Sequence, residues 1–562
     1  MLAGTLQRNA ALLGICQMCR IFIQKSSFNK WQTTWHDIDR NSRNDTLLLL
    51  EEKIFKRQIK VKNQLKIGVI LSYISTGLNI FIQLFYTPVM IRLLGQSEYG
   101  LYTLVSGFVS YLNLFTLGFT GAYLRFFSRQ KARNDVNGLA QLNGMFLTLF
   151  LLMSAVAFVC GMALAQFPRQ IFGSKLTNAE LKTAQTLMRI LVLNLALSFP
   201  AGLLESMVSA HEKFLVQRLV ILIITICNPL LALPFLLMGY GSVAVVRVST
   251  VLVLIKLISY GIYCIKFLRI RFIFHNFDFL ILQEIAEFSF FLFLNTIVEQ
   301  INWSVDKFIL GRVSGTKAVA IYGVGSQINS LFIVFSATIS SVFAPRINRI
   351  AAEAKTDMNN QFIALMTRVG RIQYLVLMLF ASGFTIFGKY FITNIYSTVE
   401  YKDAYGVALL LILPGMISLI QNLGIEIQRA INKHKVSSVI YFGMAIFNVV
   451  ISIPLAQKFG PIGSALGTAI GLVLTNGIIM NLYYRINIRL NITAFWKSIL
   501  LLSRGMIIPA ILGGAIMKWI RFNNLKIYFL FIILYSLTYL FSMWTLGMNA
   551  EEKKAVVRLM KR

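Results

Sequence analysis

The chain has 562 residues, of which 57% are hydrophobic and only 14% are charged, with a formal net charge of +32 and a mean hydropathy of +0.69. A soluble protein of this length would contain about a quarter charged residues, so the composition excludes a soluble globular class. The basic residues are spread over short connections between apolar blocks and form no basic stripe with interleaved aromatic residues, which excludes a nucleic-acid-binding surface.

Residues 1–63 differ from the rest and are predicted to form a cytoplasmic tail that is partly disordered or amphipathic. No apolar segment in this tail is followed by a small-residue cleavage site, so we expect no signal peptide. From residue 64 onwards, apolar blocks of about twenty residues follow one another, which is the length a helix needs to cross a bilayer. About fourteen spanning helices are expected, at 67–91, 100–124, 140–166, 187–210, 219–239, 243–265, 287–310, 317–341, 369–388, 404–427, 437–456, 461–484, 496–518 and 526–547.

Lysine and arginine residues concentrate in the two tails and in the connections after helices 2, 4, 6, 8, 10 and 12. The connections after helices 3, 7, 9 and 13 each hold a few basic residues and fit this pattern less well. Because basic loops stay on the cytoplasmic side, the pattern predicts that both termini are cytoplasmic, which requires an even number of spans.

The sequence contains a weak internal repeat. One constant shift of the chain against itself places Asn79 on Asn295 and Gln83 on Glu299, and a slightly larger shift places Lys213 on Lys433. The repeat predicts two six-helix lobes of the same orientation, related by an axis along the membrane normal, with the site between them. The expected parts are the tail, an N-lobe over 64–266, a C-lobe over 267–490, two further helices over 491–548 and a basic cytoplasmic tail over 549–562.

Polar residues inside the spans should mark the transport route, because a charge at the centre of a bilayer costs about 2.5–3.5 kcal/mol. On the seventh helix, four polar residues at spacings of four, three and four share one face: Asn295, Glu299, Asn302 and Asp306. Asn79 and Gln83 form a corresponding polar face on the first helix. The alternative is that these groups only form hydrogen bonds between packed helices.

Further charged residues are expected inside or near the spans. Glu205, Arg247 and Lys256 are candidates for the cavity, whereas Arg92 and Lys307 lie where their side chains could instead extend to the membrane interface. Both sets are therefore kept as candidates for lining the cavity.

Several enzyme signatures are absent from the sequence. It contains no GxxxxGK[ST] loop, no HExxH or GxSxG motif and no Cys/His metal cluster, so we expect no nucleotide motor, no cofactor and no metal site. A membrane glycosyltransferase or polymerase would need a sizeable extramembrane face with paired carboxylates, and no connection is long enough to provide one. The chain is therefore predicted to be a transporter and not an enzyme.

Several segments resemble a known family. They include "YTPVMIRLLGQSEYGLY" (Tyr86–Tyr102), "WSVDKFILGRVSGTKAVAIYGVGSQI" (Trp303–Ile328) and "AQKFGPIGSALGTAIG" (Ala456–Gly471). Over about residues 64 to 548 the chain resembles polysaccharide-unit flippases of the Wzx type, which serve O-antigen, capsule and exopolysaccharide synthesis. These belong to the multidrug/oligosaccharidyl-lipid/polysaccharide exporter superfamily. Thr116 stands where the family pattern often has an aspartate, which puts a role for an acid there in doubt.

The resemblance implies an all-α polytopic membrane protein with two six-helix lobes around a cationic central cavity, plus two C-terminal helices. The implied function is alternating-access transfer of an undecaprenyl-diphosphate-linked oligosaccharide from the cytoplasmic to the outer leaflet of the cell (inner) membrane. The implied partners are this lipid-linked oligosaccharide, membrane lipids, H⁺ or Na⁺ as candidate counter-ions, and the polysaccharide polymerase and glycosyltransferases of the same pathway.

On this hypothesis, basic side chains hold the diphosphate through charge-assisted hydrogen bonds, amides contact the sugar, and acids couple transport to an ion. The diphosphate candidates are Arg92, Arg125, Arg247, Lys256 and Lys307; the amide candidates are Asn79, Gln83, Asn295 and Asn302; the coupling candidates are Glu299, Asp306 and Glu205.

Three alternative functions stay open. A drug or small-cation antiporter of the same superfamily would need an acid-rich cavity with few bases, and the basic candidates argue mildly against it. A peptidoglycan-precursor flippase cannot be separated from a polysaccharide-unit flippase by these residues. A membrane glycosyltransferase or polymerase is disfavoured by the short connections.

Overall fold

The computed structural model of the chain describes the backbone of residues 40–116, 119–275, 279–353, 357–522 and 524–560. It divides into two units, Met1–Ile70 and Leu71–Arg562, and the second unit holds the spans and the site described below. Residues 1–39 of the predicted tail lie outside the described residues. From Arg40 the chain is helical and continues as α2 into the first predicted span.

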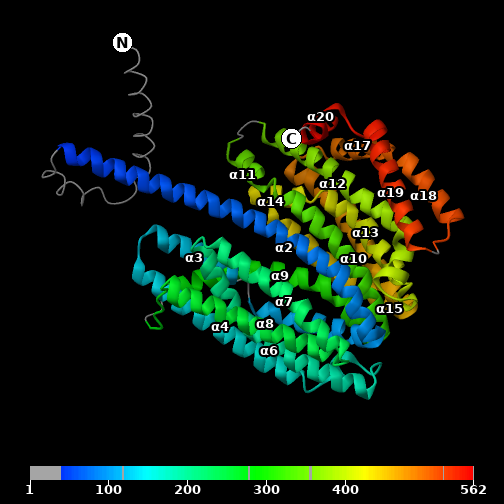
Figure 1. The fold of residues 1–562 in the computed structure, drawn as a ribbon, viewed down its shortest axis with the longest axis horizontal. Helices are drawn as coiled ribbons and strands as arrows, with labels where there is room; N and C mark the ends of the chain where they lie inside the picture. The colour runs from blue at the N-terminus through cyan, green and yellow to red at the C-terminus, as the bar shows by residue number, and fades with distance from the viewer. Residues whose placement is uncertain (1–39, 117–118, 276–278, 354–356, 523, 561–562) are drawn as a thin grey trace, which may run out of the picture. The chain divides into compact units, whose positions relative to one another are not determined.

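The described part of the chain is helical and contains no strand (Figure 1). In the first half the helices are α2 (Arg40–Ser110), α3 (Phe119–Ala132), α4 (Val136–Leu164), α5 (Pro168–Phe172), α6 (Asn178–Ala210), α7 (Phe214–Leu237) and α8 (Gly241–Ile262). In the second half they are α9 (Phe279–Val313), α10 (Thr316–Ser341), α11 (Ala344–Glu353), α12 (Met358–Tyr390), α13 (Ala404–Ile420), α14 (Leu423–Ala430), α15 (His434–Leu472) and α16 (Met480–Tyr483). Four more complete the chain: α17 (Ile492–Leu502), α18 (Ile507–Trp519), α19 (Leu525–Ser542) and α20 (Ala550–Met560).

Ten helical runs of the described chain are long and apolar enough to cross a membrane, or eleven if the bent pair α13 and α14 is one span. Two of these runs are each broken at a glycine with positive φ, namely Gly95 in α2 and Gly460 in α15. Counting the bent pair as one span and each broken run as two, and adding the 35-residue helix α9, gives the fourteen predicted spans. The structure thus agrees with the predicted spans in number, although the predicted span 100–124 falls on the end of α2, a short 3-10 segment and the start of α3. Gly95 and Gly460 allow the two breaks because glycine has no Cβ to clash at positive φ.

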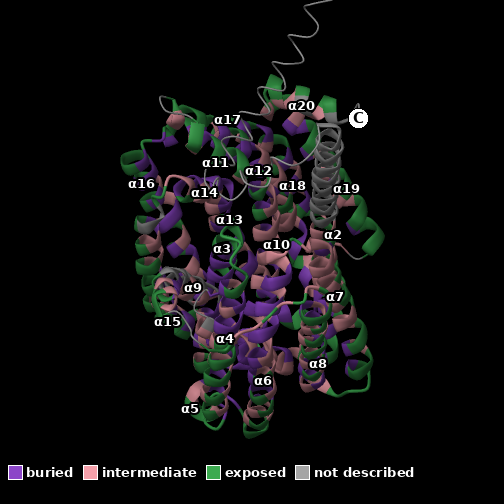
Figure 2. Cartoon of the chain, turned by 90° about the vertical axis from the view of Figure 1, so that its left-hand side faces the viewer, coloured by how far each residue is buried: buried purple, intermediate pink, exposed green. Residues whose placement is uncertain are grey.

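The outer surfaces of the spans are apolar, as a bilayer requires. Helix α7 has a mean hydropathy of 2.5 over its most apolar stretch, yet only 11% of that stretch is buried. On α19, Leu530, Ile533 and Leu537 share one face and are all more than half exposed. Figure 2 shows the buried residues concentrated where helices face one another. Such exposed apolar faces are stable in contact with lipid, not water.

Two sets of helices pack mainly among themselves. In the first half, α4 packs on α6, α6 on α8, and α7 on α8. In the second half, α10 packs on α13, α13 on α15, and α12 on α13 and α17. Helix α9 packs on α15 and α10 and also touches α3 of the first half. Helix α9 therefore connects the two sets.

Unusual backbone conformations recur along the chain at the same interval that separates Lys213 from Lys433 in the sequence. Positive-φ conformations recur at this interval, and the two members of each pair have similar φ values. The pairs are Gly95 and Gly315 (73° and 83°), Glu212 and Asn432 (60° and 57°), and Arg269 and Arg489 (51° and 62°). Gly241 and Gly460 (68° and 59°) form a fourth pair at nearly the same interval. Since non-glycine residues rarely adopt positive φ, this recurrence supports an internal repeat.

Candidate functional site

Asp306, on α9, lies in the interior of the second half with only 1% of its surface exposed. Its carboxylate accepts hydrogen bonds from the Tyr322 hydroxyl (2.7 Å), the Ser464 hydroxyl (2.6 Å) and the Thr468 hydroxyl (2.9 Å). These donors come from α10 and from the part of α15 that follows its break. A buried carboxylate is costly unless it is well hydrogen-bonded, and Asp306 meets this condition.

A second layer of polar groups surrounds this carboxylate. The Ser452 hydroxyl donates to the Asn448 side-chain oxygen (2.9 Å), and the Asn448 amide approaches the Thr468 hydroxyl (3.4 Å). Asn448 and Ser452 lie on α15 before the Gly460 break, so the break folds α15 back and brings both of its arms to Asp306. The site therefore consists of one carboxylate, one amide and several hydroxyls.

These side chains offer only oxygen and amide groups, which suits a proton or a hard cation such as Na⁺. Among the described residues there is no group of three or more His, Cys, Asp and Glu that could hold a metal ion. Lys307, the neighbour of Asp306 in the chain, packs its aliphatic stem near Gly107 on α2. We name the set Asp306, Tyr322, Asn448, Ser452, Ser464 and Thr468 the Asp306 cluster.

The other three polar residues of the predicted face on α9 are Asn295, Glu299 and Asn302. Their backbone is helical, but their side chains lie outside the described part of the structure. The polar face of α9 predicted Asp306 as a site residue, whereas the other members of the Asp306 cluster were not predicted. The four-residue spacings of Asn448 with Ser452 and of Ser464 with Thr468 were the available signal.

The first helix carries buried polar atoms without partners. The Ser75 hydroxyl, the Gln83 side-chain oxygen and the Tyr86 hydroxyl are buried and accept or donate no hydrogen bond to any described residue. Asn79 is exposed and donates to the Ser75 carbonyl of its own helix (3.0 Å). Each such unsatisfied polar group costs about 1–3 kcal/mol, and water or a bound ligand can supply the partner that the described residues do not.

The five basic candidates occupy different surroundings. Arg125 and Arg247 are exposed, Lys307 is half-buried on α9, and Lys256 forms a 2.6 Å ion pair with the coupling candidate Glu205. Arg92 is also exposed, and its guanidinium donates to the carbonyls of Asn394 (3.0 Å) and Ile395 (2.6 Å), far away in the sequence. The structure therefore does not gather the five into one cluster, and it gives Arg92 a contact between the two halves.

The two halves also meet through hydroxyl and carboxylate contacts at one end of the bundle. The Thr316 and Ser97 hydroxyls both donate to Glu180 (2.7 and 2.5 Å) and lie 3.2 Å from each other. Thr316 begins α10, whereas Ser97 and Glu180 belong to the first half. Gln96 donates nearby to the Glu400 carbonyl (3.2 Å). We name the region of Arg92, Ser97, Glu180 and Thr316 the Ser97 end.

The sequence and the fold are both similar to those of known proteins. A sequence model described as "Polysaccharide biosynthesis protein" matches residues 65–351, just over half of the 562 residues. No curated protein matches the chain in sequence.

Solved structures that share the fold include the following three. The lipid II flippase MurJ in an inward closed conformation has a TM-score of 0.65 and 17% identity, covering 85% of this chain and 97% of that one. An inward-facing multidrug resistance MATE family transporter of the MOP superfamily has a TM-score of 0.58 and 15% identity, with coverages of 73% and 98%. The Vibrio cholerae MATE transporter VcmN in its bent form has a TM-score of 0.52 and 13% identity, with coverages of 75% and 97%.

Proposed function

The chain belongs to the family of polysaccharide biosynthesis proteins, and from this premise we propose that it is a flippase for a polyprenyl-diphosphate-linked oligosaccharide. It would move the sugar-diphosphate headgroup from the cytoplasmic to the outer leaflet by alternating access while the polyprenyl chain stays in lipid. The shared fold with MurJ and MATE transporters supports alternating access between two lobes. The distribution of lysine and arginine over the connections supports cytoplasmic termini.

The observation that carries the proposal is the set of buried polar atoms without partners on the first helix. Ser75, Gln83 and Tyr86 lie on a span whose other faces are apolar, and none of their buried atoms has a described partner. A polar headgroup or the water around it would satisfy these atoms, whereas dry packing would leave an uncompensated cost. Asn295 and Asn302 are proposed to serve the same headgroup from α9.

The Ser97 end supports a two-state mechanism. Its contacts join segments of the two halves through hydroxyls, one carboxylate and the exposed Arg92, and the predicted orientation places this end outside. A few polar contacts of this kind can form and break at a cost comparable to the few kcal/mol that separate the conformations of a transporter. The conformation closed at the Ser97 end would receive the cargo from the cytoplasm.

Coupling to an ion is proposed at Asp306. Of the three acidic candidates, Glu205 is already neutralised by Lys256, whereas Asp306 is surrounded by hydroxyls and an amide. Binding of H⁺ or Na⁺ there would neutralise a buried charge on α9, the helix that touches both halves. Independently, the membrane potential favours export of an anionic headgroup by about 2.3 kcal/mol per charge at 100 mV.

A peptidoglycan-precursor flippase is the second candidate, because the likeness to the lipid II flippase MurJ covers 85% of this chain. The two candidates differ in the sugar and share the polyprenyl diphosphate. A drug antiporter, which the likeness to MATE transporters suggests, would not need to bind any diphosphate.

The test uses the purified full-length chain in liposomes with a fluorescent polyprenyl-diphosphate oligosaccharide on one leaflet, and follows its protection from a membrane-impermeant quencher. We expect transfer of this lipid, weaker transfer of a lipid II analogue and no transport of a cationic dye. In cells, deletion of the gene should lead to accumulation of a lipid-linked oligosaccharide. Dye transport without lipid transfer would overturn the proposal, and faster transfer of the lipid II analogue would favour the second candidate.

A further inference from the structure

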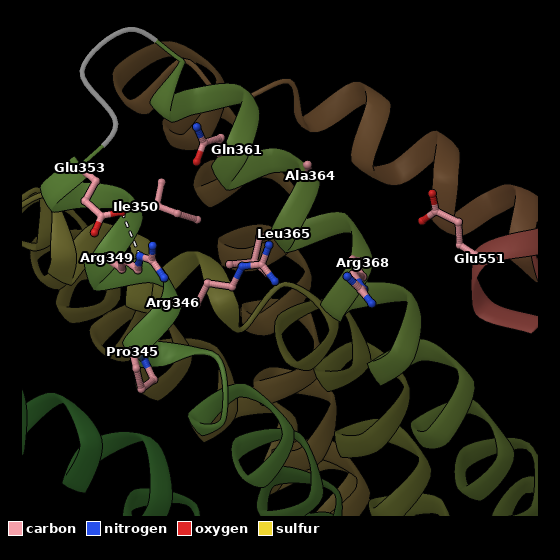
Figure 3. Close-up of a pocket in the computed structure, with 10 residues that line it drawn as sticks. All are labelled: Pro345, Arg346, Arg349, Ile350, Glu353, Gln361, Ala364, Leu365, Arg368 and Glu551. Atoms are coloured by element: carbon pink, nitrogen blue, oxygen red, sulfur yellow. Dashed lines mark hydrogen bonds and ion pairs between the residues drawn. The ribbon is translucent and has the colours of Figure 1, made fainter. Parts of the chain in front are cut away.

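A cleft of about 1070 Å³ lies between α11, α12 and α20 (Figure 3). Helix α10 begins at Thr316 in the Ser97 end and ends at Ser341, immediately before α11. Its 26 residues extend for about 39 Å at 1.5 Å per residue, so the cleft lies at the opposite end of the bundle. No step of the proposed transport mechanism uses this cleft.

Helical periodicity places basic side chains in the cleft. On α11, Arg346 and Arg349 are exposed and line the cleft together with Ile350, one turn after Arg346, whereas Ile347 is buried in the core. On α12, Arg368 lies two turns after Gln361, and both line the cleft. Figure 3 shows the side chains of Arg346 and Arg349 extending from α11 into the space beside α12, which carries Arg368.

The acidic residues of the cleft leave part of this positive charge uncompensated. Glu353 forms a 2.9 Å ion pair with Arg349 one turn before it, which accounts for one arginine. Arg346 and Arg368 form no ion pair with a described residue. Glu551, on α20, lines the cleft as its second carboxylate.

The wall formed by α20 is held in place by a buried arginine. Arg371, on α12 one turn after Arg368, donates to both carboxylate oxygens of Glu552 (2.5 and 2.8 Å) and to the Ser498 carbonyl on α17 (2.8 Å). Because Arg371 is only 7% exposed, this bidentate pair is shielded from solvent. It fixes the start of α20 and thereby keeps Glu551 at the cleft.

We infer that this cleft binds the phosphate group of an anionic headgroup. The guanidinium groups of Arg346 and Arg368 approach from two helices, and a guanidinium matches a phosphate through paired, charge-assisted hydrogen bonds. The cleft is broad and open, which suits a headgroup rather than a small ion. Glu551 opposes an anion in the same space, so it keeps the affinity moderate and allows release. The inference does not depend on which sugar the protein transports.

The phosphate can belong to a membrane lipid, to a polyprenyl diphosphate or to a soluble anion, and three probes distinguish these sources. With the full-length chain in detergent, native mass spectrometry measures retained phosphatidylglycerol against phosphatidylcholine and retained short-chain polyprenyl diphosphate. Calorimetric titration with inorganic pyrophosphate measures the binding of a soluble anion. The double variant Arg346→Ala/Arg368→Ala should weaken binding of the phosphate-bearing probe by about tenfold or more.

The matched control is Arg133→Ala/Arg485→Ala, which removes the same charge from two exposed positions outside the cleft. It should change binding by less than about twofold, since neither arginine lines the cleft and solvent and salt screen exposed charges that do not touch the ligand. Arg346→Lys/Arg368→Lys should restore part of the affinity, and Glu551→Gln should raise it by about two- to threefold because one repulsive carboxylate is lost. Equal losses in the cleft and control variants, or no loss in either, would overturn the inference.

Discussion

The two halves of the chain use the same positions of the repeat for opposite purposes. Each residue of the Asp306 cluster has a counterpart in the first half. The shift that places Asn79 on Asn295 gives the counterpart on the first helix, and the shift that places Lys213 on Lys433 gives those on the later helices. The resulting pairs, second half first, are Asp306 and Met90, Tyr322 and Tyr102, Asn448 and Asn228, Ser452 and Ala232, Ser464 and Ala244, and Thr468 and Val248. The acid and the serine and threonine residues of the second half thus correspond to apolar residues of the first.

The first-half positions are filled by packing. Met90 and Ala232 belong to one hydrophobic core cluster, and Val248 packs against it. The tyrosine and the amide persist, and Asn228 donates to Ser249 (3.1 Å) much as Asn448 approaches Thr468. The first half therefore folds with an apolar side chain, Met90, at the position that corresponds to Asp306. A buried carboxylate that the fold can do without is best explained by function, because it costs stability to bury.

The largest effect is expected when an acid is placed in the first half. Met90→Asp should lower the free energy of unfolding by about 3–5 kcal/mol, because a buried charge there would lack the serine and threonine hydroxyls that surround Asp306. Denaturation of the purified protein in detergent measures the loss, with Met90→Leu as the control at less than about 1.5 kcal/mol. If Met90→Asp were as stable as wild type, the first half would be able to hold an acid and the argument from asymmetry would fail.

The next largest effect concerns transport and the second half. Asp306→Asn retains the size of the side chain but removes its charge, so ion-coupled lipid transfer should fall by at least about tenfold, or about 1.4 kcal/mol. Transfer in liposomes with imposed Na⁺ or pH gradients measures this change. Asp403→Asn, at the exposed start of α13, is the control and should transfer lipid at the wild-type rate.

The two variants also give different answers if Asp306 only stabilises the fold. In that case Asp306→Asn would lower stability while transfer by the remaining folded protein kept its full dependence on Na⁺ and pH. A dependence on both gradients that survives intact in Asp306→Asn would exclude the coupling role. Coupling would then have to be sought at Glu299.

Ser464→Ala gives the second half the residue that the first half has at Ala244. Asp306 would lose a 2.6 Å hydrogen bond and keep those from Tyr322 and Thr468. The free energy of unfolding should therefore fall by about 1 kcal/mol, and the affinity for the coupling ion should fall by several-fold. Ser503→Ala serves as the control, because that hydroxyl donates to a carbonyl only one turn before it (3.1 Å). An unchanged ion dependence in Ser464→Ala would remove this hydroxyl from the site.

The sequence was sufficient for the spans and for one residue of the site. Apolar blocks of about twenty residues reveal themselves without tertiary information, and Asp306 stood out because an acid inside such a block is rare. Its partners Ser464 and Thr468 did not, because hydroxyl residues are common in membrane helices and their contact with α9 depends on how helices far apart in the chain pack. The sequence did predict the reversal at Gly460, because one expected span ends at residue 456 and the next begins at 461, but it did not show that the reversal brings these hydroxyls to Asp306.

Arg92 was predicted from the sequence, but its contacts could not be. Its charge near a predicted cavity favoured a diphosphate contact, but side-chain spacing along one helix cannot reveal the carbonyls of Asn394 and Ile395, which lie far along the chain in the second half. Arg371 and Glu552 were missed for the same reason, since they are far apart in the sequence.

The smallest expected effect tests the Ser97 end. In the repeat, Arg92 corresponds to Phe308, so only the first half carries a cation there that can bind the opposite half. Arg92→Gln should weaken the contact with Asn394 and Ile395 by about 0.5–1 kcal/mol, because the position is exposed and solvent competes for the hydrogen bonds. A change of that size shifts the ratio of closed to open Ser97 ends by about two- to fivefold without unfolding the protein. Distances between spin labels on either side of this end measure the ratio, with the exposed Arg189→Gln on α6 as the control. If Arg92→Gln instead abolished binding of the diphosphate lipid and left the ratio unchanged, Arg92 would belong to the cargo site, and the contact between the halves would be incidental.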